Sequence, residues 1–193
     1  SQCMNNMRQV GIGLHNHVSA KNKLPSGGEG TIWTPGAIGT GFDVTSTFTQ
    51  LLPYLEEVTV AGMYDYKYAY DDLARPNNQV AAKTEISSFR CPSNSIRELD
   101  PAGYGGVDYM PTVYTDIDPV TGLRNASTAT ARNARTDGAL ALVGVNISKV
   151  TDGTSKTIAI AEDVGRNFET QEPFTKSKYP DIANIAPDAK TPS

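Results

Sequence analysis

The chain has 193 residues and a formal net charge of −4, with 38% hydrophobic and 20% charged residues. This acidic balance argues against a nucleic-acid surface or a polybasic membrane patch. No apolar run reaches the roughly 18 residues that span a bilayer. Two His and two Cys exclude a metal scaffold rich in either residue. Composition alone therefore indicates a soluble, loop-rich α+β domain.

The first predicted element is an amphipathic helix of about five turns that ends before Leu24 and Pro25. Its apolar residues recur at steps of three and four, at Cys3, Met7, Val10, Leu14 and Val18. Gly11 and Gly13 each cost about 1 kcal/mol relative to Ala in a helix interior. Because the pattern also starts without a clear capping box, we expect the tail of a longer helix.

The elements that follow are predicted to be short. Residues 26–45 favour a loop or an irregular strand. A second helix is capped by Thr45 or Ser46 and runs through Leu55, and a third is capped by Asn77 or Asn78. Alternating or apolar segments predict strands at 63–70, 86–91, 104–114, 138–145 and 157–161. A long surface loop is expected at 116–136, a tight turn at 151–155 and a loosely held tail at 176–193.

Few residues here have the spacing that chemistry requires. His15 and His17 lie two apart on the helix, point to different faces and are interpreted as surface residues. Asp116 and Asp118 faintly resemble a calcium loop, but Pro119 replaces the third acidic position, so a plain turn is favoured. The tyrosines at 64–70 favour a half-buried strand over a sugar-binding face. No catalytic or cofactor-binding residue is predicted.

Five short motifs resemble, in order, those of one family. Residues 2–16, QCMNNMRQVGIGLHN, resemble QCxNNLKQIGLALHN; residues 51–56, LLPYLE, resemble LLPYLEQ; and residues 89–93, FRCPS, resemble FLCPS. The Asp-Gly at 137–138 and the segment 147–162 resemble DG…ITDGTSNTI…GE. The family is the planctomycete-type group of prepilin-like proteins, which carry a prepilin N-terminal cleavage and methylation signal and a domain of unknown function.

The resemblance implies a pilin-like α+β fold, in which one long N-terminal helix packs on an antiparallel sheet with long loops. It implies an upstream membrane-spanning helix that this chain lacks, and export to the cell surface, an extracellular filament or the periplasm. Residues 1–24 would be the end of the long helix, 25–175 the head domain and 176–193 the tail. The family's usual final strand has no counterpart after Glu162.

The function implied is that of a non-enzymatic subunit of a type IV pilin-like or type II secretion pseudopilin-like filament. Its partners would be copies of itself or other pilin-like subunits, and not nucleic acid. Met7, Val10 and Leu14 would dock the helix on the sheet, while Met4 and Val18 would contact a neighbouring subunit. The alternative is an exported, membrane-anchored module that binds glycan or calcium.

The family resemblance also bears on the two cysteines. Export favours a disulfide between Cys3 and Cys91, whereas a cytosolic protein would keep two buried free thiols. A bond across 88 positions would contribute about 4–5 kcal/mol in the chain-entropy model.

Overall fold

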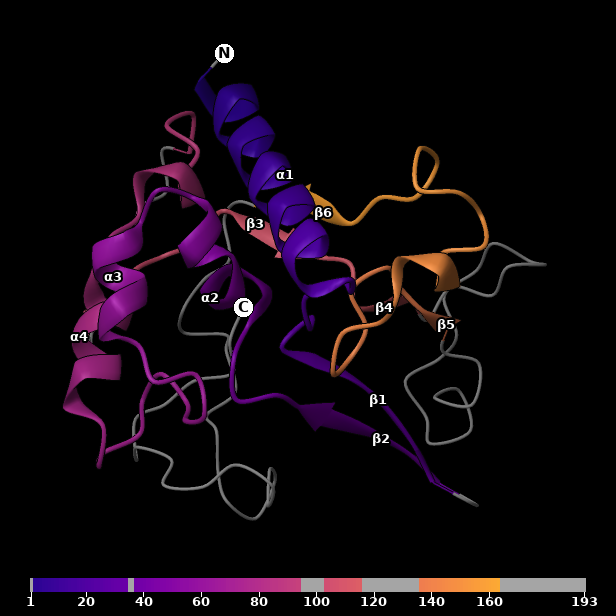
Figure 1. Cartoon of the computed structure of the whole chain (residues 1–193), viewed down its shortest axis with the longest axis horizontal. Coiled ribbons are helices and arrows are strands. Elements are labelled where there is room, and N and C mark those ends of the chain that lie inside the picture. The colour runs from indigo at the N-terminus through magenta and orange to yellow at the C-terminus, as the bar shows by residue number, and fades with distance from the viewer. Residues whose placement is uncertain (1, 35–36, 95–102, 116–135, 164–193) are drawn as a thin grey trace.

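The computed structural model describes residues 2–34, 37–94, 103–115 and 136–163. One long helix, α1 (Gln2–Lys21), lies across many short elements (Figure 1). The other helical elements are α2 (Thr47–Leu51), η1 (Leu52–Tyr54), α3 (Val58–Met63), α4 (Pro76–Lys83), η2 (Ser87–Phe89) and η4 (Ile147–Lys149). The strands are β1 (Glu29–Thr34), β2 (Ala37–Phe42), β3 (Tyr109–Pro111), β4 (Tyr114–Thr115), β5 (Thr136–Asp137) and β6 (Ile160–Glu162). They form three antiparallel pairs, β1–β2, β3–β6 and β4–β5. This mixture of helices and small sheets agrees with the α+β class.

The buried face of α1 is turned relative to the predicted apolar stripe. The side chains buried along it are Cys3, Asn6, Val10, Gly13 and His17. Met7, Leu14 and Val18 lie half-buried at the edge of this face, and Met4 is 70% exposed. Asn6 and His17 are therefore interior residues, although the hydrophobic pattern left both on the polar side.

The helix α1 ends at an asparagine in the left-handed region. Asn22 has φ +57, and its N–H donates to the Val18 carbonyl at 2.8 Å. Asparagine tolerates this conformation better than most residues, so it closes the last turn without a glycine. The chain then turns back under the helix through the buried Leu24 and Pro25.

The packing beneath α1 differs from the expected helix on a sheet. In the described residues α1 packs on α2, η1 and η2. Val10 and Leu51 are fully buried there, and the rings of Phe48 and Phe89 meet edge to face at 5.0 Å. The β3–β6 pair also lies behind α1 in Figure 1 and contacts its first turn through Tyr109. Strands of two to six residues offer no broad face, so short helical turns provide most of the packing against the buried side of α1.

The predicted strand at 63–70 was wrong, because this segment winds around one buried asparagine. Asn78 has no exposed surface and lies inside α4 rather than capping it. Its Oδ1 accepts from the Asp65 N–H at 2.7 Å, and its Nδ2 donates to the Asp65 and Ala69 carbonyls, both at 3.1 Å. These bonds satisfy loop backbone that a strand would pair with a neighbour.

Two further strand predictions were also wrong. The segment 86–91 contains the single turn η2 instead of a strand. The segment 138–145 is broken by positive φ at Val143 (+69) and Gly144 (+67). Its backbone bonds to separate parts of the chain, with Leu140 donating to the Thr112 carbonyl at 3.2 Å. Short strands do occur within 104–114 and at the end of 157–161, where β3 pairs with β6.

The predictions for the second helix and for the turns and loops have mixed outcomes. The second helix begins after Ser46, whose side chain accepts from the Thr49 N–H as predicted for a cap. The turn 151–155 has Gly153 at φ +87. Of the predicted loop 116–136, residues 116–135 lie outside the described residues, as does the tail 176–193, while Thr136 begins β5. The division at 24/25 and 175/176 stays a prediction. Among the described helices, none combines the length and apolarity needed to cross a membrane.

Candidate functional site

The most distinctive cluster joins the start of α1 to the segment after η2. Cys3, in the first turn of α1, forms a disulfide with Cys91, the pairing that the family resemblance implies. The two residues are 8% and 1% exposed, and the sequence separation is 88. The bond therefore fixes the helix to the head at its N-terminal end.

A buried amide reinforces this junction one turn further along α1. The Nδ2 of Asn6 donates to the carbonyls of Ser87, at 3.1 Å, and Arg90, at 2.6 Å. Its Oδ1 accepts from Gln2 Nε2 at 3.0 Å. Both carbonyls belong to the η2 segment that leads into Cys91, so the amide holds this segment against the helix independently of the disulfide. We call the disulfide and the Asn6 hydrogen bonds the upper lock.

An acidic residue orders the backbone around Cys91. Asp108 is 4% exposed, and its Oδ2 accepts from the Cys91 N–H at 2.7 Å. Its Oδ1 accepts from Asn94 Nδ2 at 3.0 Å and from Arg90 Nη1 at 3.2 Å. The largely buried Arg90 guanidinium also lies 3.8 Å from Glu85 Oε1. Charge-assisted bonds of this kind satisfy a buried carboxylate and stiffen the loop that carries it.

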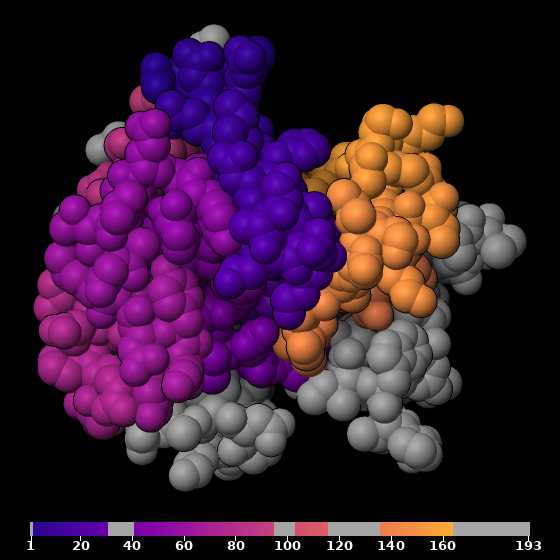
Figure 2. All heavy atoms as spheres, viewed as in Figure 1, coloured from indigo at the N-terminus to yellow at the C-terminus, as the bar shows by residue number. Residues whose placement is uncertain are grey.

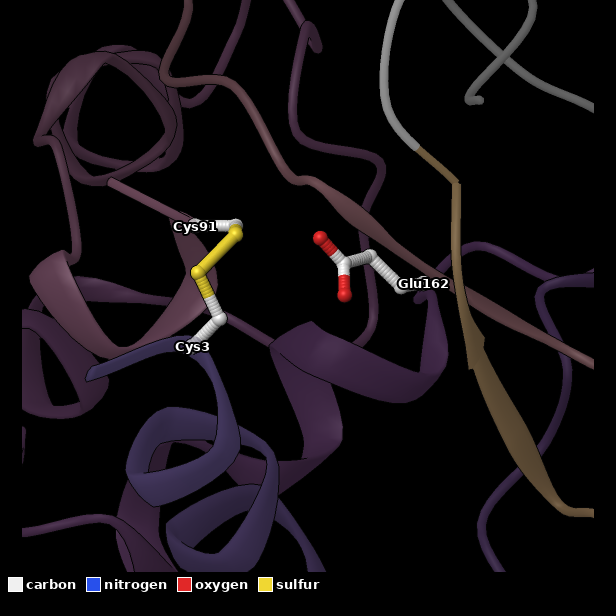
Figure 3. Close-up of side chains that lie close together, drawn as sticks. All are labelled: Cys3, Cys91 and Glu162. Carbon is white, nitrogen blue, oxygen red and sulfur yellow. A yellow bond between two sulfur atoms is a disulfide. The ribbon is translucent and has the colours of Figure 1, made fainter. Parts of the chain in front are cut away.

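A tyrosine and a glutamate complete the cluster from β3 and β6. The Tyr109 hydroxyl donates to the Cys3 carbonyl at 3.2 Å. Burial, followed by the nearby Glu162 and Asp108 carboxylates, raises the pKa of Tyr109. Glu162 lies opposite Tyr109 in the β3–β6 register, and its carboxylate points toward the disulfide (Figure 3). A carboxylate oxygen of Glu162 and the two sulfurs all lie within 4.8 Å of one another.

A second contact holds the other end of α1. His17 is 5% exposed, its Nδ1 lies 3.2 Å from the Lys23 carbonyl, and its ring packs edge to face on Tyr54 at 5.4 Å. Because a carbonyl only accepts, this contact requires the proton on Nδ1. Burial, with Lys21 and Lys23 adding to it, lowers the pKa of His17. We call the contacts of His17 with Lys23 and Tyr54 the lower lock. They contradict the prediction that His17 is a surface residue.

The opposite face of α1 is exposed to solvent and carries two apolar side chains, Met4 and Ile12, with the exposed Arg8 between them. Met4 is 70% and Ile12 51% exposed, and a methyl group added at Gly11 would meet nothing within 4 Å. On the surface, α1 runs between the segment bearing α3 and α4 and the segment 136–163, and its outer side is open in this view (Figure 2). Of the residues predicted for subunit contact, Met4 lies on this face, whereas Val18 is half-buried at its edge.

The predicted calcium loop and the tyrosine segment, the two weaker candidate sites, have different outcomes. Asp116 and Asp118, the calcium candidates, lie outside the described residues. The tyrosines of 64–70 do not form the exposed stacking face that glycan binding requires. Tyr64 is 8% exposed and pairs with Tyr66, and the Arg75 guanidinium lies over the Tyr68 ring at 3.9 Å.

The residues that sequence reasoning missed are Asn6, His17 and Asp108. All three are polar residues, which a hydrophobic pattern assigns to the surface, and their burial is satisfied by hydrogen bonds to other parts of the chain. One signal was available for Asn6 and His17, since both continue the i, i+3, i+4 series through Cys3, Val10 and Gly13.

Comparison with known proteins gives one match. The model of a family described as a protein of unknown function (DUF1559) matches residues 1–187. No curated protein and no solved structure matches the chain. The chain therefore belongs to the DUF1559 family, the prepilin-like group that its motifs resemble.

Proposed function

We propose that this protein is a structural, non-enzymatic subunit of a pilin-like or pseudopilin-like filament. The observation that carries the proposal is the way α1 is held. One face of the helix contacts the head at both ends, through the disulfide and Asn6 of the upper lock and through the packing of the His17 ring on Tyr54 in the lower lock. The other face presents Met4 and Ile12 to solvent. A helix that is attached to the head along one face and exposed along the other suits a subunit whose assembly depends on that helix.

Family membership supports the same role. In the proposed filament, the hydrophobic segment that the prepilin resemblance implies continues α1 upstream and packs with like helices. The head covers that core, and the outward face of α1 contacts the neighbouring subunit. Contacts between unlike surfaces generate an open helical filament when the rotation between neighbouring subunits does not close into a ring. Export, attachment to the membrane before assembly, and partners restricted to like subunits belong to the same proposal.

The outward face provides the test. The full-length protein, with its upstream segment, is expressed in its own host, and surface material is sheared, sedimented and imaged. We expect Met4→Glu and Ile12→Glu to abolish or strongly reduce sedimenting filaments, because each places a charge in an apolar contact. Gln9→Glu adds the same charge at an exposed position off this face and should assemble normally.

Two results would count against the proposal. One is normal assembly of both Met4→Glu and Ile12→Glu, with thermal stability unchanged. The other is filament formation by residues 1–193 alone, which would remove the need for an upstream helix. A binding role for glycan or calcium is the second candidate, but no observation among the described residues favours it.

A further inference from the structure

Two kinds of metal-binding group meet at the upper lock. The sulfurs of Cys3 and Cys91 and the carboxylate of Glu162 lie within 4.8 Å of one another (Figure 3). We propose that reduction of the Cys3–Cys91 disulfide converts these two cysteines and Glu162 into a site for a thiophilic divalent cation. The ion, Zn²⁺ by preference, is held by the two thiolates and the Glu162 carboxylate. This site goes beyond the filament role and does not depend on it.

The backbone of each of the three ligand residues is held by contacts other than the disulfide, and the Glu162 side chain is exposed. The Cys3 carbonyl accepts from the Tyr109 hydroxyl at 3.2 Å, and the Cys91 N–H donates to Asp108 at 2.7 Å. Glu162 is placed by its register opposite Tyr109. Cleaving the S–S bond therefore leaves the backbone of all three residues tied to the same structure, and side-chain rotation is enough to separate the sulfurs.

The donor set is typical of zinc. Two thiolates and a carboxylate supply three protein ligands, which leaves a fourth tetrahedral position for water. Thiolates select Zn²⁺ over Mg²⁺ and Ca²⁺, which prefer oxygen ligands. Asp108 is not a fourth ligand, because both of its oxygens accept hydrogen bonds. Once the thiols ionise, three negative groups crowd together, and a dication offsets their repulsion.

Reduction of the disulfide takes two electrons and two protons, and a dithiol supplies both. The dithiol is oxidised to its own disulfide, and its two electrons and two protons pass to the sulfurs of Cys3 and Cys91. Each thiol then releases its proton to solvent as its sulfur binds the ion, so two protons leave for each Zn²⁺ bound.

The test uses the whole chain, reduced by a phosphine that becomes its oxide, and titrated with Co²⁺ and then Zn²⁺. We expect a thiolate-to-Co²⁺ charge-transfer absorption that saturates at one ion per chain and is displaced by Zn²⁺. The oxidised protein and the variant Cys3→Ser/Cys91→Ser should show none. Glu162→Gln should weaken binding by about tenfold or more, whereas Glu56→Gln, at an exposed position outside the cluster, should not.

Near-ultraviolet circular dichroism shows whether the reduced chain stays folded. If it does not, Zn²⁺ must restore the spectrum of the oxidised protein, because binding to the folded state shifts the equilibrium toward it. Absence of the charge-transfer band overturns the proposal, as does failure of Zn²⁺ to refold a reduced chain. Equal affinity in Glu162→Gln and the unsubstituted protein overturns the three-ligand site, because binding then needs only two cysteines.

Discussion

Replacing Asn6 by Ala should destabilise the protein strongly while leaving the disulfide intact. The substitution removes both donors to the Ser87 and Arg90 carbonyls, at 3.1 and 2.6 Å. A partly buried carbonyl left without its donor costs about 1–3 kcal/mol, and two are affected. Ala recovers about 0.5 kcal/mol through its higher helix propensity. We therefore expect a net loss of about 1.5–5.5 kcal/mol, a large share of a typical domain's stability.

The neighbouring Asn5 supplies the control, because it is exposed on the same turn. Asn5→Ala gains the same helix propensity without losing a buried hydrogen bond, so the difference between the two variants isolates the Asn6 contacts. The assay is guanidinium chloride unfolding, followed by far-ultraviolet circular dichroism under non-reducing conditions. If Asn6→Ala falls within about 0.5 kcal/mol of Asn5→Ala, the upper lock does not stabilise the fold as argued here.

Three further predictions concern the same helix. In the same assay, the free energy of unfolding of the double variant Cys3→Ala/Cys91→Ala should be lower by about 4–5 kcal/mol. A decrease below about 1 kcal/mol would contradict a stabilising role for the disulfide. Gly11→Ala should raise the free energy of unfolding by about 1 kcal/mol. Gly13→Ala should raise it by less, because the added methyl group would lie 2.7 Å from the Leu55 side chain. Equal increases in the two variants would contradict this close contact. His17 has its pKa lowered below 6.5 by burial, so its contribution to stability is complete above pH 6.5 and decreases as the pH falls below it. His17→Gln should flatten the stability profile between pH 7 and 5, and an unchanged slope would place the ring in solvent.

The long helix and the turn chemistry could be predicted because both are local. The spacing of Val10 with its neighbours specifies a helix. Ser46 has the side chain that a helix cap requires, and Gly153, without a Cβ, adopts the positive φ of its turn. The disulfide was expected only from the family resemblance, since two cysteines 88 positions apart give no geometry by themselves.

The rest of the fold depends on contacts between distant segments, which a local pattern does not report. The tyrosines at 64–70 alternate like a strand, yet Asn78 binds their backbone and winds it into a loop. The apolar run at 138–145 also fits a strand until Val143 and Gly144 adopt positive φ. In both segments a tertiary contact or a backbone turn overrides intrinsic preference.

Electron microscopy of the native full-length protein, recovered from cell surfaces with its upstream segment, tests the central claim most directly. We expect filaments with a regular subunit repeat, in which α1 faces the filament core and the head lies outside. Dispersed, membrane-anchored monomers would contradict it and would shift the search to a ligand.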